Sequence, residues 1–156
     1  MNGESHEIEG AVDIIQYDPM GDIVARRRAG NLILNSGREV LAGLFAKLIE
    51  DRDIRVGVGE KGEDFRPTDT IDRRTFIDQT GIDAPEISVD ETTNRVRLTF
   101  SASFGEEQAA GLLREAGILF ASNSTGQPDI LYNGVTFSQI DKHIGDTLTL
   151  NWEVTF

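Results

Sequence analysis

The chain has 156 residues, and its hydrophobic fraction of 38% is that of a folded protein with a sizeable core. Its formal net charge of −12 at pH 7 would repel a nucleic-acid backbone unless a local basic patch were present. The lack of cysteine excludes disulfides, thiolate chemistry and cysteine-based zinc sites.

The basic residues and the apolar runs limit the partners further. Arg26 to Arg28 is the main basic cluster, but successive residues of a strand point to opposite faces, so it cannot form a continuous basic surface. We therefore expect no nucleic-acid partner. The apolar runs are far shorter than the ~20 residues of a membrane span. Because the N-terminus is also acidic, we expect neither membrane insertion nor secretion through a signal peptide.

The balance of charged residues is relevant to the salt conditions in which the protein works. The chain has 27 acidic and 15 basic residues, and few of the basic ones are lysines. Such a surface is typical of proteins that work in very high salt, where a strong charge keeps a protein soluble despite screening. A G+C-rich gene, which favours arginine codons, explains the same composition equally well, and the sequence leaves both interpretations open.

The N-terminal part of the chain predicts a hairpin. Residues 7–17 alternate loosely, residues 18–21 have the Asp-Pro-Met-Gly sequence of a turn, and residues 22–28 return as a second strand. A short apolar strand follows over residues 31–35.

A helix is predicted over Ser36–Glu50. Ser36 and Glu39 have the spacing of a capping box, which marks a helix start. Apolar residues then recur at steps of three and four, as on one face of an amphipathic helix: Val40, Leu41, Leu44, Phe45, Leu48 and Ile49. We expect this face to cover one side of a sheet.

Residues 60–85 follow a short strand over 54–59 and predict a long, exposed excursion. The segment is polar, and glycines and prolines interrupt it throughout. Long excursions in compact domains often carry interactions, so we place a candidate interaction surface here. Its predicted residues are Phe65, Arg66, Thr70, Ile71, Arg73, Arg74 and Phe76. Residues 70–77 fit either a short strand or a helical turn.

The rest of the chain predicts strands. A hairpin is expected over residues 86–104, a brief helical or loop segment before residue 113, and strands over 113–121 and 130–137, the latter open to a split at Asn133-Gly134. Residues 147–156 alternate strictly between polar and apolar side chains, as in a half-buried strand. We predict one domain over residues 1–156, an antiparallel β-sandwich of about 7–9 strands with one amphipathic helix.

No pattern in the sequence defines a catalytic site. His6 and His143 lie far apart and do not have the spacing of a paired zinc-binding motif, so the sequence does not support a zinc site or a histidine-based triad. The glycines around residues 57–62 do not have the order of a phosphate-binding loop, because Lys61 precedes its glycine. We expect no enzyme activity, no cofactor and no metal ligands, although a Ca²⁺ or Mg²⁺ ion in the acidic loops is left open.

Four blocks of the sequence resemble structural proteins of tailed phages and archaeal tailed viruses. They are N-L-I-L-N-S-G-R-E-V-L-A-G-L-F-A at 31–46, I-R-V-G-V-G at 54–59 with P-T-D-T at 67–70, L-R-E-A-G-I-L-F at 113–120, and L-T-L-N-W-E-V-T-F at 148–156. The resemblance is to small tail- or fibre-associated proteins. It implies a non-enzymatic virion component that is assembled in the host cytoplasm, in multiple copies, in the tail, baseplate or fibre region. Its partners would be copies of itself and other virion proteins.

Three alternatives remain open from the sequence. The protein could instead decorate the exterior of the head or form a turret there. It could be a receptor- or carbohydrate-binding module at a fibre, which would need exposed aromatic side chains such as Tyr132 or Trp152. Most of the aromatic residues, Trp152 among them, are expected in the core. A hydrolase would need a cleft with perturbed carboxylates, and nothing in the sequence singles out such a pair.

Overall fold

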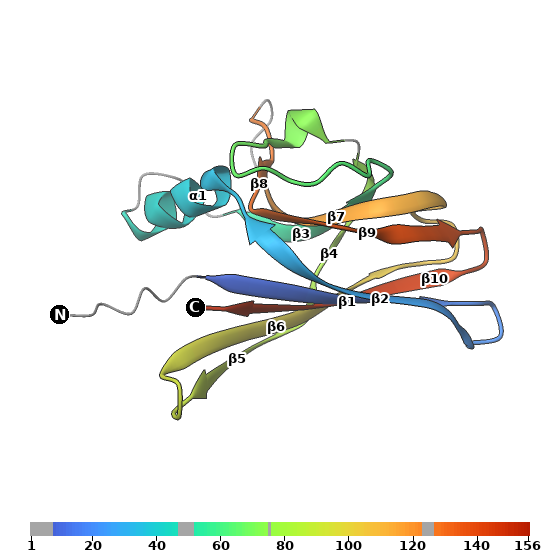
Figure 1. Cartoon of the computed structure of the whole chain (residues 1–156), viewed down its shortest axis with the longest axis horizontal. Helices are drawn as coiled ribbons and strands as arrows, with labels where there is room; N and C mark the ends of the chain where they lie inside the picture. The colour runs from blue at the N-terminus through green and yellow to red at the C-terminus, as the bar shows by residue number, and fades with distance from the viewer. Residues whose placement is uncertain (1–7, 47–51, 75, 123–126) are drawn as a thin grey trace.

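The fold is built from antiparallel strands with one α-helix. A computed structural model of the chain describes residues 8–46, 52–74, 76–122 and 127–156. These residues form the helix α1 (Asn35–Phe45) and a short 3₁₀ helix, η1 (Ile71–Arg73). The strands are β1 (Glu9–Tyr17), β2 (Ile23–Ile33), β3 (Asp53–Gly59), β4 (Phe76–Gly81), β5 (Asp83–Asp90), β6 (Arg95–Phe104), β7 (Gly111–Ala121), β8 (Ile130–Leu131), β9 (Asn133–Lys142) and β10 (Thr147–Thr155), as labelled in Figure 1.

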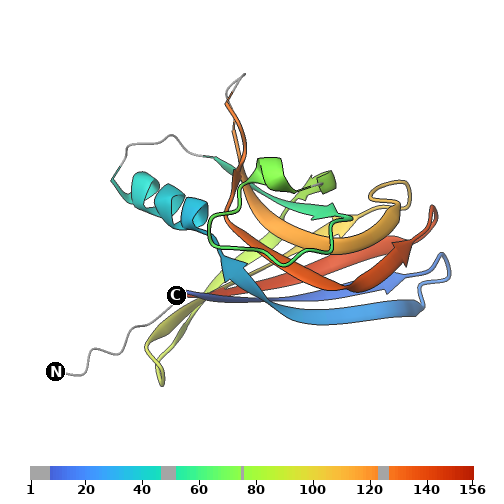
Figure 2. The ribbon, with the colours of Figure 1, turned by 45° about the horizontal axis from the view of Figure 1, so that its top comes forward.

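The strands form one curled sheet whose two halves face each other. The strand order is β4-β3-β7-β9-β2-β1-β10-β6-β5, and β8 pairs with β7. In Figure 2, the strands β3, β7 and β9 arch over β2, β1 and β10. We call β4-β3-β7-β9 the upper half and β2-β1-β10-β6-β5 the lower half. A single residue, Ile82, separates β4 from β5, so the chain passes almost directly from one end of the sheet to the other.

The main core lies between the two halves. Strand β10 supplies alternate buried side chains, among them Leu150 and Trp152, and the upper half faces them with Val56 and Ile118. This alternation is the one that the sequence shows over residues 147–156. The prediction that Trp152 lies in the core is confirmed, since it is 2% exposed, and Tyr132 is also buried, at 3%.

The prediction of a mainly β, antiparallel fold with one helix is confirmed. The described residues contain ten strands rather than seven to nine, partly because β8 is a separate two-residue strand. The break before β9 falls at Tyr132, so Asn133 and Gly134 are not a hairpin turn but pair with Ile33 and Leu32 of β2. Residues 106–110 are turn and loop rather than helix.

Helix α1 differs from the prediction at its start and on its apolar face. It begins at Asn35, and its last predicted residues, 47–50, lie outside the described part of the chain. The capping box does not form, because the Ser36 hydroxyl donates to the backbone carbonyl oxygen of Leu131 at 2.6 Å instead. Val40 is buried as expected, but Phe45 is 94% exposed.

Candidate functional site

Residues 60–74 cross the outer face of the upper half of the sheet, and we call this segment the strap. Figure 2 shows it as the green loop with a short helical turn in front of β3, β7 and β9. A second, smaller core lies beneath it, formed by Leu34, Phe65, Leu119 and Leu131, with Ile71 and Phe76 packed against them. Both faces of β7 are therefore covered, because its alternate residues Ile118 and Phe120 belong to the main core. The predicted excursion over 60–85 is thus a packed strap, followed by β4 and the start of β5, rather than one exposed loop.

Glycines on the sheet make room for the aromatic rings under the strap. Gly57 of β3 pairs with Gly117 of β7. A Cβ atom at Gly57 would lie 2.9 Å from the ring of Phe76, and one at Gly117 would lie 3.1 Å from it. Gly134 of β9 is covered in the same way by the ring of Phe65. The glycines around residue 57 therefore serve close packing rather than phosphate binding.

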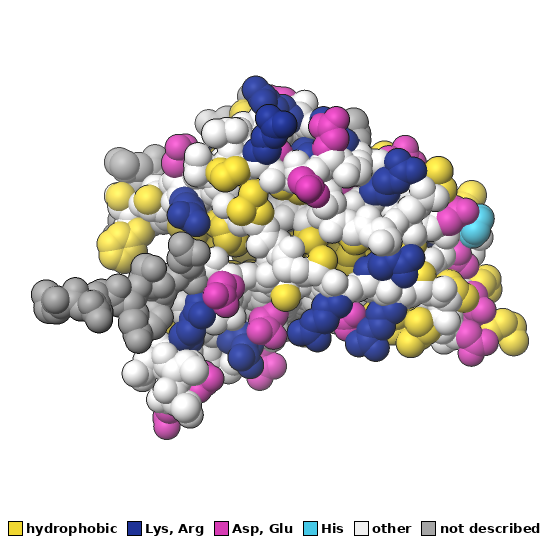
Figure 3. All heavy atoms as spheres, viewed as in Figure 1, with side chains coloured by type: hydrophobic (Ala, Val, Ile, Leu, Met, Phe, Trp, Pro, Cys, Tyr) yellow, Lys and Arg dark blue, Asp and Glu magenta, His cyan; other side chains and the backbone are white. Residues whose placement is uncertain are grey.

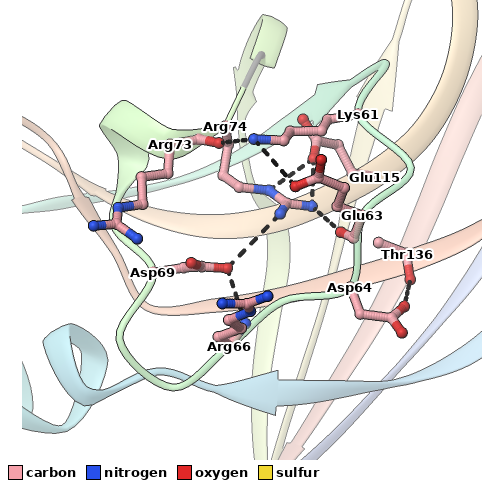
Figure 4. Close-up of polar contacts among 9 residues, drawn as sticks. All are labelled: Lys61, Glu63, Asp64, Arg66, Asp69, Arg73, Arg74, Glu115 and Thr136. Atoms are coloured by element: carbon pink, nitrogen blue, oxygen red, sulfur yellow. Dashed lines mark hydrogen bonds and ion pairs between the residues drawn. The ribbon is translucent and has the colours of Figure 1, made fainter.

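A buried ion pair fixes the strap to β7. The Arg74 guanidinium lies 2.7 Å from Glu115 Oε2, and the two side chains are 2% and 0% exposed. Arg74 Nη2 also donates to the backbone carbonyl oxygen of Glu63 at 2.7 Å, and the guanidinium carbon lies 3.6 Å from the centre of the Phe65 ring. Figure 4 shows Arg74 and Glu63 of the strap converging with Glu115 of the sheet. Every side of the guanidinium is thus used by strap or sheet, as a buried charge requires.

Further contacts hold the rest of the strap. Asp69 accepts a hydrogen bond from Arg66 N at 2.8 Å and lies 3.7 Å from Arg74. Lys61 Nζ donates to the backbone carbonyl oxygen of Arg73 at 2.7 Å, which closes the strap on itself. Thr136 of β9 donates to Asp64 at 3.0 Å. Asp64 and Arg74 thus attach the strap to β9 and β7, and the Lys61–Arg73 bond joins its two ends.

The predicted interaction residues divide into two groups. Phe65 and Arg74 are buried, and Phe76 and Ile71 are half-buried against the sheet, so these side chains hold the strap in place. Arg66, Thr70 and Arg73 are exposed.

Sequence reasoning missed Glu115 and Asp69, the acidic partners of Arg74. The signal for Glu115 was present, because it stands in the apolar run L-L-R-E-A-G-I-L-F, and a buried carboxylate needs a cationic partner.

The outer side of the strap carries charges of both signs. Residues 60–74 contain four basic residues, Lys61, Arg66, Arg73 and Arg74, and five acidic residues, Glu60, Glu63, Asp64, Asp69 and Asp72. Of these, Arg74 and Asp69 are buried. All of these charged residues except Glu60 line an open hollow of about 380 Å³. Basic and acidic side chains lie side by side over the upper part of the molecule in Figure 3. The strap therefore carries a net formal charge of only −1, in a chain whose formal charge is −12.

His143 and Lys142 are two titratable groups outside the strap whose chemistry could serve a catalytic or metal site. The His143 side chain is 71% exposed and lies 3.3 Å from Asp141 and 3.5 Å from Asp146. Lys142 is buried, and burial lowers its pKa, while its Nζ donates to the backbone carbonyl oxygen of Gly105 at 3.0 Å. His6 lies outside the described residues. Among the described residues, no three histidine, aspartate or glutamate side chains are grouped so that they could hold a metal ion.

Within the described part of the chain, no helix combines the length and the apolar character needed to cross a membrane. The described residues define a curled antiparallel sheet with a strap locked across one outer face. Comparisons with protein-family models, with curated proteins and with solved structures found no match for this chain. The resemblance to tailed-virus proteins therefore stays a prediction from the sequence.

Proposed function

We propose that this chain is a non-enzymatic structural protein of a tailed-virus particle, and that it assembles in multiple copies through the outer side of the strap. The four sequence blocks support the viral class, with the tail, baseplate or fibre as its place. The charge balance of the strap supports assembly, and it is the observation that carries the proposal. Other virion proteins would be further partners.

The strap is where two copies of an acidic chain can meet without strong repulsion. Elsewhere, two surfaces of like charge approach each other at a cost. On the strap, four basic residues are interspersed among five acidic ones within residues 60–74, so its net formal charge is only −1. In a two-fold contact the exposed Arg66 and Arg73 of one copy would face acidic residues such as Asp64 and Asp72 of the other, and the reverse pairs would form as well.

The buried attachments of the strap favour this role because they hold its outer side in one conformation. The side chains that contact the sheet, and so are not available to a partner, are those of Arg74, Phe65 and Phe76. A surface that is ordered before association loses less conformational entropy when it binds. The strap would therefore bind as a preformed surface and not as a loop that folds on contact.

Light scattering coupled to size exclusion at low and high salt tests the assembly step. The wild-type chain is expected to form a multimer that dissociates as salt rises. The double variant Arg66→Glu, Arg73→Glu should be monomeric, because it leaves the strap strongly acidic. Arg97→Glu on β6, where Arg97 forms an exposed ion pair with Glu153, makes the same kind of charge change away from the strap and should leave the multimer intact. A wild-type chain that stays monomeric at low salt and high concentration contradicts the proposal.

The viral class is tested separately. A gene position beside portal or tape-measure genes is expected, and mass spectrometry of purified particles should detect the chain in many copies. A gene that stands among metabolic genes, with no such neighbours, would refute the viral class while leaving the assembly test valid. Antibody labelling of particles would then distinguish the tail from the exterior of the head.

A further inference from the structure

Strand β5 ends the sheet and has a free side. It pairs with β6, from Asp83↔Ser101 to Asp90↔Arg95. It is the last strand in the sheet order, and no strand among the described residues pairs with its other side. Figure 1 shows β5 at the lower edge of the molecule, beyond β6. An edge of this kind presents unpaired backbone groups to a further strand.

The register identifies which backbone groups are free. Val96 of β6 exchanges two backbone hydrogen bonds with Phe156, at 3.2 and 2.8 Å, so its N–H and C=O point towards β10. Its neighbour Arg97 must therefore point its backbone groups to β5, where it is opposite Ser88. By the same alternation, the backbone groups of Ile87 and Val89 point away from β6, into the free edge.

The apolar side chains of this edge are also uncovered. Ile87 and Val89 are 72% and 65% exposed. They lie opposite Leu98 and Val96 of β6, on the side of the sheet that forms the core further along the strands. The apolar inner face thus continues past the covered core to an edge where a further strand would bury it.

Acidic residues on the other side of β5 oppose pairing with a second copy. In the antiparallel register that pairs the whole stretch 86–90 with itself, Glu86 of each copy would face Asp90 of the other, and like charges in that position are destabilising. The basic side chains on β6 offset this only in part, because Arg97, whose charge also acts on Asp90, lies 3.2 Å from Glu153, and Arg95 lies 3.4 Å from Glu9. The same two acidic residues would attract a strand with basic residues.

We propose that the free edge of β5, residues 86–90, binds an extended segment of a partner protein in which basic residues alternate with apolar ones. The segment adds an antiparallel strand to the sheet, with its backbone bonded to Ile87 and Val89. Its apolar side chains cover Ile87 and Val89, and its basic side chains lie beside Glu86 and Asp90. Pro85, which has no N–H, and Ala84, with φ of 50°, limit the edge on its N-terminal side. This surface is separate from the strap, so it does not depend on the proposed function.

Peptides of matched composition test the proposal on the full-length chain. The probe is the fluorescein-labelled peptide acetyl-TKVTVRT-amide, whose antiparallel pairing places lysine beside Asp90 and arginine beside Glu86. One control, TEVTVET, reverses the charges, and the other, TKPTPRT, keeps them but cannot form a strand. Fluorescence anisotropy should show the probe binding about tenfold more tightly than either control, and amide NMR shifts should centre on Ile87 and Val89.

A charge-reversed variant separates edge pairing from general attraction to an acidic chain. Glu86→Lys with Ser88→Lys changes two exposed side chains on the outer face and keeps the Asp90 turn, in which the carboxylate accepts from Thr92 N at 2.9 Å. This variant should prefer TEVTVET over the probe. Equal binding of the probe and TKPTPRT, or an unchanged preference in the variant, would overturn the proposal. So would failure of the probe to bind, or a wild-type dimer abolished by Ile87→Thr with Val89→Thr, since a second copy would then be the occupant.

Discussion

Arg74 and Glu115 are 41 residues apart in the chain, yet their side chains meet at 2.7 Å beneath the strap, where neither is accessible to solvent. The pair joins a segment with little regular structure to the middle strand of the upper half. Losing either partner destabilises the fold, because one buried charge without the other costs far more free energy than the intact pair contributes. The pair therefore acts as a fixed anchor for the strap.

Breaking the anchor on one side should destabilise the protein strongly. Arg74→Met leaves the Glu115 carboxylate buried without its cation, and the expected loss is about 3–5 kcal/mol in the free energy of unfolding. Urea denaturation measures it. The double variant Arg74→Met, Glu115→Leu should recover most of that loss, because the Glu115 charge is removed with its partner and Asp69 keeps the hydrogen bond from Arg66 N. Asp13→Asn, which weakens the pair with the 60% exposed Arg26 side chain, should change stability much less. A single variant as stable as the wild type would contradict the anchor.

Filling the space at Gly134 should also release the strap. A methyl group there would collide with the Phe65 ring, and overpacking of this kind costs about 1–3 kcal/mol. Gly30→Ala on β2 is the matched control, because the nearest atom to its new Cβ is a backbone oxygen at 3.8 Å. Limited proteolysis should cut Gly134→Ala within residues 60–74 before the control. Equal stability and equal cleavage of the two variants would show that the ring does not hold the strap.

Sequence reasoning predicted the strands well, because alternation is a local property. Residues 147–156 alternate strictly, and β10 shows the same alternation in its burial. Patterns that depend on distant partners were misjudged. The Ser36 hydroxyl bonds Leu131 rather than capping its own helix, and the polar residues of 60–74 suggest exposure although Phe65 and Arg74 are buried beneath them.

The candidate site was only partly predictable for the same physical reason. The segment was identified from its length and polarity, and Arg66, Thr70 and Arg73 are exposed there. Which of its side chains turn inward depends on Glu115 and Gly134, from two other strands. The sequence alone does not show that these two positions lie under the strap, because that depends on the order of the strands in the sheet. A charged residue inside an apolar strand is the one local sign that something must pack on that face.

Asp146 should affect how the free energy of unfolding changes at acidic pH. Burial on its own would raise the pKa of this carboxyl, but hydrogen bonds from His143 N and Gln16 Nε2, and the nearby imidazole, lower it overall from 3.8. A lowered pKa in the folded state means that the contribution is complete above pH 3.8 and is lost as pH falls through the lower, folded value. Asp146→Asn should be less stable at neutral pH and should lose less stability below pH about 4. Parallel curves for both proteins in acid titrations of urea unfolding would contradict this role.

Tyr132 should determine how stability changes at alkaline pH, because the residue is buried, with 3% of its surface exposed. Burial raises the pKa of Tyr132 from 10.0 to about 12, while Arg38 lowers it slightly. The folded protein therefore keeps the phenol protonated at a pH where the unfolded chain ionises it, so stability should fall as pH rises from 10 towards 12.

Tyr132→Phe should remove this loss of stability at high pH. It should cost nothing at neutral pH, since no described group lies within hydrogen-bonding distance of the buried hydroxyl. Tyr17→Phe, on the half-buried Tyr17 of β1, is the control. Thermal melts between pH 8 and about 11.5 compare the three proteins, and an alkaline loss of the same size in Tyr132→Phe as in wild type would assign the effect to another group.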